Sequence, residues 1–312
     1  MRRSYDVAQY EASHRRRTRV AALLIFVCIP LTFLLAAGFF GTGRYLLLGM
    51  IILIYTMIPF FMVFEKRKPK AREIVLIAVM AAMTVCISMV FHVTIPIKAG
   101  STMVIIAGIS LGPEAGFLVG ALARFVLNFY QGHGAWTPWQ MFCWGLLGFL
   151  AGLCFNKVSV DKLKSRSFKV VMGPVLCILF AEIVAYVFYL LFPGEDTTFF
   201  GWRLYVFGAA GLLAGVLLQR KRLPVDSVTL TVFTFFTIFI IYGGIMNICA
   251  MVTSAAIPGG APVSLETLRA LYISGATYDA GHAGTAALFM FLFGEKIIRK
   301  VERVKLKYGI YR

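Results

Sequence analysis

Long apolar runs separated by short polar segments dominate the chain, and most runs are long enough to form a membrane-spanning helix. A straight helix needs about 20 mostly apolar residues to cross a bilayer. The pattern therefore predicts an all-α polytopic membrane protein with about ten crossings. The predicted crossings are Val20 to Phe40, Tyr45 to Phe64, Glu73 to His92, Ser101 to Leu111, Glu114 to Tyr130, Pro138 to Phe155, Phe168 to Phe192, Arg203 to Leu218, Val228 to Thr253 and Ala276 to Glu295.

The run from Ser101 to Leu111 is too short for a straight crossing. Shortened elements at membrane depth are usually surrounded by protein, because lipid cannot satisfy exposed backbone groups. We therefore expect this segment to be enclosed by other helices and to form a cavity wall rather than a lipid-facing surface.

Composition excludes a soluble protein, since 60% of the residues are hydrophobic, 14% are charged and the mean hydropathy is +0.82. The six cysteines lie in apolar runs without CxxC spacing, and the sequence contains no HExxH motif. We therefore predict no metal or other cofactor. The sequence also has no P-loop motif, so we expect no ATP hydrolysis by a P-loop mechanism. We predict that the protein is not an enzyme.

The net charge of +17 comes from Lys and Arg residues that lie between the apolar runs. This distribution indicates a membrane topology rather than a nucleic-acid-binding surface. In the predicted arrangement, 26 of the 31 Lys and Arg residues fall in segments on one side, including both termini. We therefore expect a multi-pass protein of the cell membrane with both termini cytoplasmic. The basic segments are expected to contact anionic membrane lipid, and no nucleic-acid partner is expected.

Basic segments also divide the chain into four predicted parts. Residues 1–70 form a basic tail and an N-terminal transmembrane hairpin, and residues 71–155 form core helices 1 to 4. Residues 156–223 form an inserted transmembrane hairpin with basic segments on both sides. Residues 224–312 form core helices 5 and 6 and a basic C-terminal tail. Because the insert crosses the membrane twice, six crossings remain in the core.

Five short motifs in this core carry small, aromatic and amide side chains. They are Ala78 to Ala82 (AVMAA), Gly108 to Gly120 (GISLGPEAGFLVG), Gly134 to Gln140 (GAWTPWQ) leading into Trp144-Gly145, Tyr242 to Asn247 (YGGIMN), and Tyr278 to His282 (YDAGH). With these motifs, residues 71–155 and 224–298 resemble the substrate-binding S component of an energy-coupling factor (ECF) transporter. The combination is most similar to members assigned to cobalamin or related vitamins. The two hairpins depart from the six-helix family pattern.

The resemblance implies a protein that captures a vitamin outside the cell and releases it inside while bound to a transmembrane T subunit and two ATPase subunits. It also implies that Ala78 and Ala82 dock the T subunit. These alanines are four residues apart, so they share one helix face and would allow another helix to approach closely. Ordinary packing within the bundle would explain the same spacing.

Candidate substrate-binding residues lie in the middle of the core. Arg124 is inside a predicted crossing, where a guanidinium needs a partner, water or the bundle interior, and Asn128 follows one turn later. Arg124 would then contact an anionic substrate group or an internal acid, or extend to the membrane surface. In the next loop, Trp136 and Trp139 offer flat rings and Gln140 an amide, although an interfacial aromatic belt also explains the tryptophans.

The last predicted crossing adds Tyr278, Asp279 and His282, and the preceding one adds Asn247. Asp279 and His282 are three residues apart and could bind a ligand, a metal or a proton. Two such groups are too few to predict a metal site. The sequence offers no third ligand and no nucleophile at a suitable spacing, which argues against an intramembrane enzyme.

The leading interpretation is the capture component of an ECF-type importer that binds a vitamin or related ring-bearing micronutrient. The alternative is a self-contained proton- or ion-coupled secondary transporter that uses Arg124, Glu182, Asp279 and His282 as a relay.

Overall fold

The structure is a computed structural model of the full chain. It describes residues 71–94, 97–155, 168–192, 198–218, 223–255, 257–308 and 310, together with short pieces before residue 56 that include the π-helical turn η1 (Leu24–Cys28). The predicted N-terminal hairpin otherwise lies outside the described residues.

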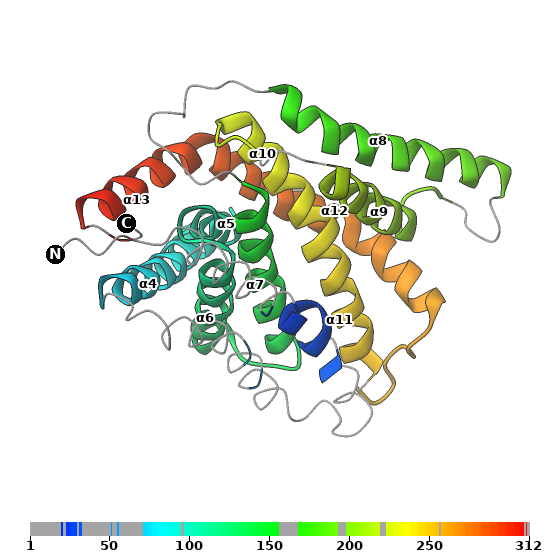
Figure 1. Ribbon diagram of the computed structural model, residues 1–312. Helices are drawn as coiled ribbons and strands as arrows, with labels where there is room; N and C mark the ends of the chain where they lie inside the picture. Colours follow the sequence, from blue (N-terminus) through cyan, green and yellow to red (C-terminus); the bar gives the residue numbers. More distant parts are fainter. Residues whose placement is uncertain are drawn as a thin grey trace.

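Every regular element in the described part of the chain is helical, which confirms the all-α prediction (Figure 1). The elements are α4 (Ala71–Thr94), α5 (Ala99–Leu111), α6 (Pro113–Gln131), α7 (Thr137–Cys154), α8 (Phe168–Leu191), α9 (Trp202–Leu218), α10 (Ser227–Phe236), η4 (Thr237–Gly243), α11 (Gly244–Ala255), α12 (Leu265–Phe289), η5 (Met290–Gly294) and α13 (Glu295–Lys307). Segments η4 and η5 are π-helical stretches that continue the helices around them.

The predicted count of ten crossings is not confirmed. By length and apolar composition, the described part holds three candidate membrane spans: Ala71–Phe91, Gly173–Leu191 and Ser227–Ala255. Ala99–Leu111 is apolar but shorter. Apolar runs therefore located helices, whereas the number of crossings stays a prediction.

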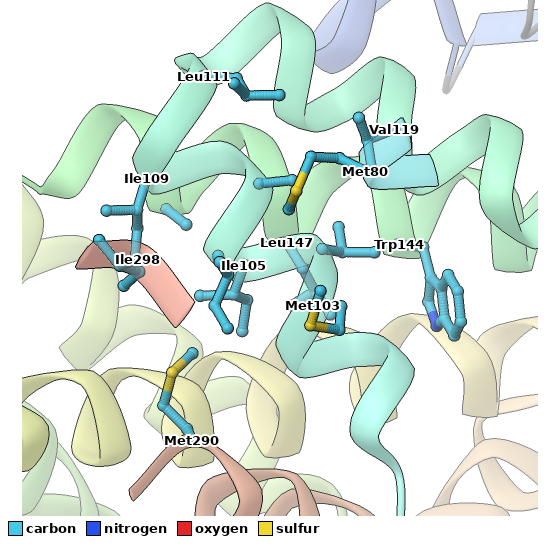
Figure 2. Packing of buried hydrophobic residues seen from close by; sticks show 14 of the residues in the cluster. Met80, Met103, Ile105, Ile109, Leu111, Val119, Trp144, Leu147, Met290 and Ile298 are labelled. Atoms are coloured by element: carbon cyan, nitrogen blue, oxygen red, sulfur yellow. The ribbon is translucent and has the colours of Figure 1, made fainter. Parts of the chain in front are cut away.

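Helix α5 is at the centre of the bundle, and all of its residues are buried. It contacts α4, α6, α7, α12 and α13, and Figure 2 shows its side chains Met103, Ile105 and Ile109 packed among residues from these neighbours. At its side, Thr102 Oγ1 donates to the carbonyl oxygen of Ala286 in α12 at 2.8 Å. The prediction that this short segment is enclosed by protein is confirmed.

Three glycines let α5, α6 and α7 approach to backbone contact. A Cβ atom added to Gly108 would collide with the carbonyl oxygen of Gly148, and one added to Gly116 would lie 2.7 Å from the same oxygen. The turn between α5 and α6 is made at Gly112, whose φ of 99° favours glycine. The apolar glycine-rich pattern therefore serves close helix packing.

Helices α8 and α9 form a hairpin at the edge of the bundle (Figure 1). Gly211 and Gly215 of α9 face Ile178 and Pro174 of α8, while much of the remaining surface of α8 is apolar and exposed. The chain enters and leaves this hairpin at one place, because Leu223 N donates to the carbonyl oxygen of Cys154 at 2.7 Å.

The last predicted crossing, Ala276 to Glu295, began later and ended earlier than the continuous helix that contains it. Helix α12 begins at Leu265 rather than Ala276, and the helix continues through η5 and α13 to Lys307. The hydropathy pattern missed the first turns because they carry Glu266 and Arg269. A local signal was nevertheless present: Ser264 caps the helix and accepts a hydrogen bond from the backbone N–H of Thr267 at 3.1 Å.

Candidate functional site

Arg124, Asn128, Thr137 and Gln140 form one hydrogen-bonded group, here called the amide–arginine cluster. It lies where α6 ends and α7 begins. Arg124 Nε donates to Gln140 Oε1 at 2.9 Å. Asn128 Nδ2 donates to the same oxygen at 3.1 Å and to Thr137 Oγ1 at 3.2 Å. Three of the predicted binding residues are therefore in direct contact, and Thr137 joins them.

The amide–arginine cluster leaves hydrogen-bonding capacity unused. Asn128 is fully buried, yet its Oδ1 atom has no hydrogen-bond partner. A buried acceptor without a partner costs free energy, so such atoms often mark a place where a ligand or water binds. The Arg124 guanidinium also lies over the Trp144 ring, with 5.3 Å between its central carbon and the ring centroid.

The two tryptophans of the loop have different surroundings. Trp136 is 43% exposed and its ring covers Gly134, where a Cβ atom would lie 2.5 Å from the ring. Trp139 is partly buried and packs against the apolar cluster that contains Phe117 and Met141. Of the two rings, Trp136 therefore has more surface available for contact with another molecule.

Asp279 is at the centre of a second polar group that joins α9, α11 and α12. The hydroxyl of Tyr205 donates to Asp279 Oδ2 at 2.7 Å, and Asn247 Nδ2 donates to the same oxygen at 2.8 Å. The Tyr205 ring stacks on Tyr272 with 4.4 Å between the ring centroids. Two of the predicted binding residues, Asp279 and Asn247, are thus in contact.

His282 belongs to a third group at the beginning of α5. Its Nε2 atom is 3.0 Å from Ser101 Oγ, and its ring packs edge to face on Tyr242 at 4.7 Å between centroids. Its Nδ1 atom is buried and has no hydrogen-bond partner. Tyr278 is 63% exposed and has the Lys98 ammonium 5.8 Å from its ring centroid.

Arg124 connects the first group with the third. Its central guanidinium carbon lies 5.3 Å from the centroid of the Trp144 ring. Trp144 occupies the space between, because a Cβ atom added to Gly100, next to Ser101, would lie 2.7 Å from its ring. No described hydrogen bond joins Asp279 to His282, so these two predicted residues do not act as a directly bonded pair.

Sequence reasoning missed Thr137, Ser101 and Tyr205 as members of these groups. Tyr205 is on α9, in the predicted inserted hairpin. The hydropathy pattern of that segment does not indicate that Tyr205 contacts Asp279. Among the described residues, no group of three His, Cys, Asp or Glu side chains is placed to hold a metal ion.

Part of the chain is similar to a known protein family. Residues 68–199, which span α4 to α8, match the family described as "ECF-type riboflavin transporter, S component". This supports a substrate-binding component of an ECF transporter. The match does not confirm the closer similarity to cobalamin-type members. No curated protein and no solved structure matches the chain.

The matched stretch of this S-component-like protein contains the amide–arginine cluster and the whole of α5, whereas Asn247, Asp279 and His282 lie beyond it. It also includes α8, which the sequence pattern assigned to the insert. The match to an S component thus covers part of the candidate site, which combines matched and unmatched segments.

The structure places the predicted partner-docking residues on an open surface. Ala78 and Ala82 are both exposed on α4, beside exposed Val75, Val79 and Met83. Packing inside the bundle is instead made by the opposite face, which includes buried Met80 and Ala81. Among the described residues, the small-residue face of α4 is therefore exposed.

Replacing Tyr205 with phenylalanine is expected to lower stability by about 1–2 kcal/mol, because Asp279 then loses one of its two buried hydrogen bonds. Thermal melting of the purified protein in detergent measures this change. Tyr186→Phe is the matched control, since Tyr186 is 48% exposed on α8. An equal change in both variants would contradict a stabilising role of the Tyr205 hydroxyl.

Proposed function

We propose that this protein is the substrate-capture component of an ECF-type importer in the cell membrane. It binds a vitamin or related ring-bearing micronutrient on the outer side and delivers it to the cytoplasm together with a T subunit and two ATPase subunits. The sequence motifs favour cobalamin or a precursor, and the name of the matched family points to riboflavin. Both are ring-bearing molecules.

One observation carries the proposal: the matched segment 68–199 is also the segment in which Arg124, Asn128 and Gln140 converge. Polar side chains inside a membrane protein are costly and usually serve binding or transport. The Trp144 ring lies beside the Arg124 guanidinium, and an aromatic ring next to polar groups suits a ligand with a flat ring.

The proposed architecture has ten crossings, with a six-helix core, both termini in the cytoplasm, and two additional hairpins. The contact between Cys154 and Leu223 supports the inserted hairpin of residues 156–223, because it holds the last residue of the insert beside the end of the preceding core helix. Tyr205 on α9 contacts Asp279 on α12, so the hairpin also contributes to the core. In this topology Lys98 and Trp136 are near the outer surface.

Copurification tests the proposal directly. A tagged full-length chain, expressed in its native cells and purified from their membrane, is expected to copurify with a T subunit and two ATPase subunits. Uptake in proteoliposomes should require these subunits and ATP. A chain that transports alone, with uptake abolished when the proton gradient is collapsed, would instead establish the secondary transporter. No described hydrogen bond links Glu182 to Asp279 or His282, so the structure adds no support for that relay.

A further inference from the structure

Two basic side chains converge at the beginning of α5 without an acidic partner. The Lys98 ammonium lies 5.8 Å from the centroid of the Tyr278 ring, which packs on His282. The Arg124 guanidinium lies over the Trp144 ring, which reaches Gly100 at the beginning of α5. Among the described residues, no carboxylate forms an ion pair with either cation. Asp279, which lies on α12 three residues before His282, instead accepts hydrogen bonds from Tyr205 and Asn247 on one carboxylate oxygen. The local charge is therefore positive.

An unpaired guanidinium at this depth is unfavourable, because the low dielectric of its surroundings penalises a charge without a counter-charge. The hydrogen bond from Arg124 Nε to Gln140 is to a neutral amide, and its cation–π contact with Trp144 leaves the charge uncompensated. Arg124 can satisfy its remaining donors by binding a planar acidic group with two parallel hydrogen bonds.

His282 offers a further donor beside the two cations. The residue is 6% exposed, and its Nδ1 atom has no partner. When Ser101 donates to Nε2, the ring proton is on Nδ1, and this N–H then lacks an acceptor. An acidic oxygen atom of a ligand would supply both the missing acceptor and the missing negative charge.

We propose that the substrate of this protein carries a carboxylate or phosphate group, which Arg124 and Lys98 bind, while its ring contacts nearby aromatic side chains. This inference rests on the proposed function and specifies its substrate class. A neutral ligand would fill the aromatic part of the site and leave Arg124 without a counter-charge.

The test uses two pairs of probes that differ in charge. The full-length chain in phosphatidylcholine nanodiscs is titrated with flavin mononucleotide and riboflavin, which differ by a phosphate, and with nicotinate and nicotinamide, which differ by a carboxylate. In at least one pair the anionic member should bind about tenfold more tightly or better. The phosphate pair and the carboxylate pair distinguish the two acidic groups.

Arg124→Gln should weaken binding of the preferred anion by about tenfold or more and reduce its preference over the neutral partner, whereas Arg124→Lys should retain part of it. Arg303→Gln is the matched control, because Arg303 is exposed on α13, and it should bind like the parent. Far-UV circular dichroism and thermal melting show whether each variant is folded.

Equal or tighter binding of the neutral partners, or unchanged binding by Arg124→Gln, would overturn the proposal.

If none of the four probes binds, mass spectrometry of the molecule that copurifies decides: a ligand with an acidic group supports the proposal, and a neutral ligand or no ligand overturns it. Loss of anion binding in phosphatidylglycerol nanodiscs would assign the anion site to lipid and also overturn the substrate assignment. Copurification with the T and ATPase subunits is a separate measurement, so a failed anion preference leaves the capture function intact.

Discussion

Gly148→Ala is expected to destabilise the protein by roughly 3 kcal/mol or more, at the upper end of the cost of overpacking. A Cβ atom at this position would collide with the backbone of Gly116 across the contact between α6 and α7. Neither backbone can move without displacing α5, which packs on both helices. Thermal melting in detergent and the yield of monodisperse protein measure the effect.

The matched control is Gly284→Ala on α12. No atom lies within 4 Å of a Cβ added at Gly284, so this variant should keep or gain stability, by about 0.5–1 kcal/mol from better helix propensity. If Gly148→Ala melts at the same temperature as Gly284→Ala, the close approach of α6 and α7 does not contribute to stability, and the account of the bundle centre is wrong.

Ala78→Leu combined with Ala82→Leu is expected to reduce ATP-dependent uptake by about tenfold or more, because overpacking one close helix contact costs roughly 1–3 kcal/mol. Both alanines are exposed on α4, so the leucines cause no clash within this chain. The expected loss therefore lies in association with the T subunit. Copurification of the T subunit and uptake in proteoliposomes measure it.

The control for this variant is Ala209→Leu combined with Ala210→Leu, which adds the same volume at two exposed positions of α9. It should retain uptake and subunit association. Substrate binding by the isolated chain should be equal in the two double variants, since Ala78 and Ala82 are outside the three polar groups of the site. Normal uptake by the α4 variant would exclude this face as the docking surface.

Helix positions were well predicted where the chain is continuously apolar. The predicted crossing Glu114 to Tyr130 and the observed helix α6 (Pro113–Gln131) differ by one residue at each end. The prediction failed at α12, where Glu266 and Arg269 interrupt the apolar pattern although the helix continues. Hydropathy reports the environment of a segment, and a helix that extends beyond its apolar part is recognised only from its cap at Ser264.

The contacts of the candidate site were predicted in part. Arg124 and Asn128 are one helical turn apart, so their proximity follows from the sequence, and Gln140 comes close through a short loop. The contact between Tyr205 and Asp279 joins residues 74 positions apart and could not be inferred from local spacing. Asp279 and His282 share a helix, yet they face different neighbours, because each side chain bonds to the helix that packs beside it.

The sequence by itself determined that this is a helical membrane protein with basic connecting segments, because composition and apolar run length directly reflect the cost of placing polar groups in lipid. It also identified Arg124 and the residues around Gln140 as candidates, since polar groups within apolar runs are costly. The tertiary structure decided which of these groups meet, that α5 is enclosed on all sides, and that Ala78 and Ala82 face outward. These features depend on how helices pack against one another, and the order of residues along one helix does not specify its neighbours.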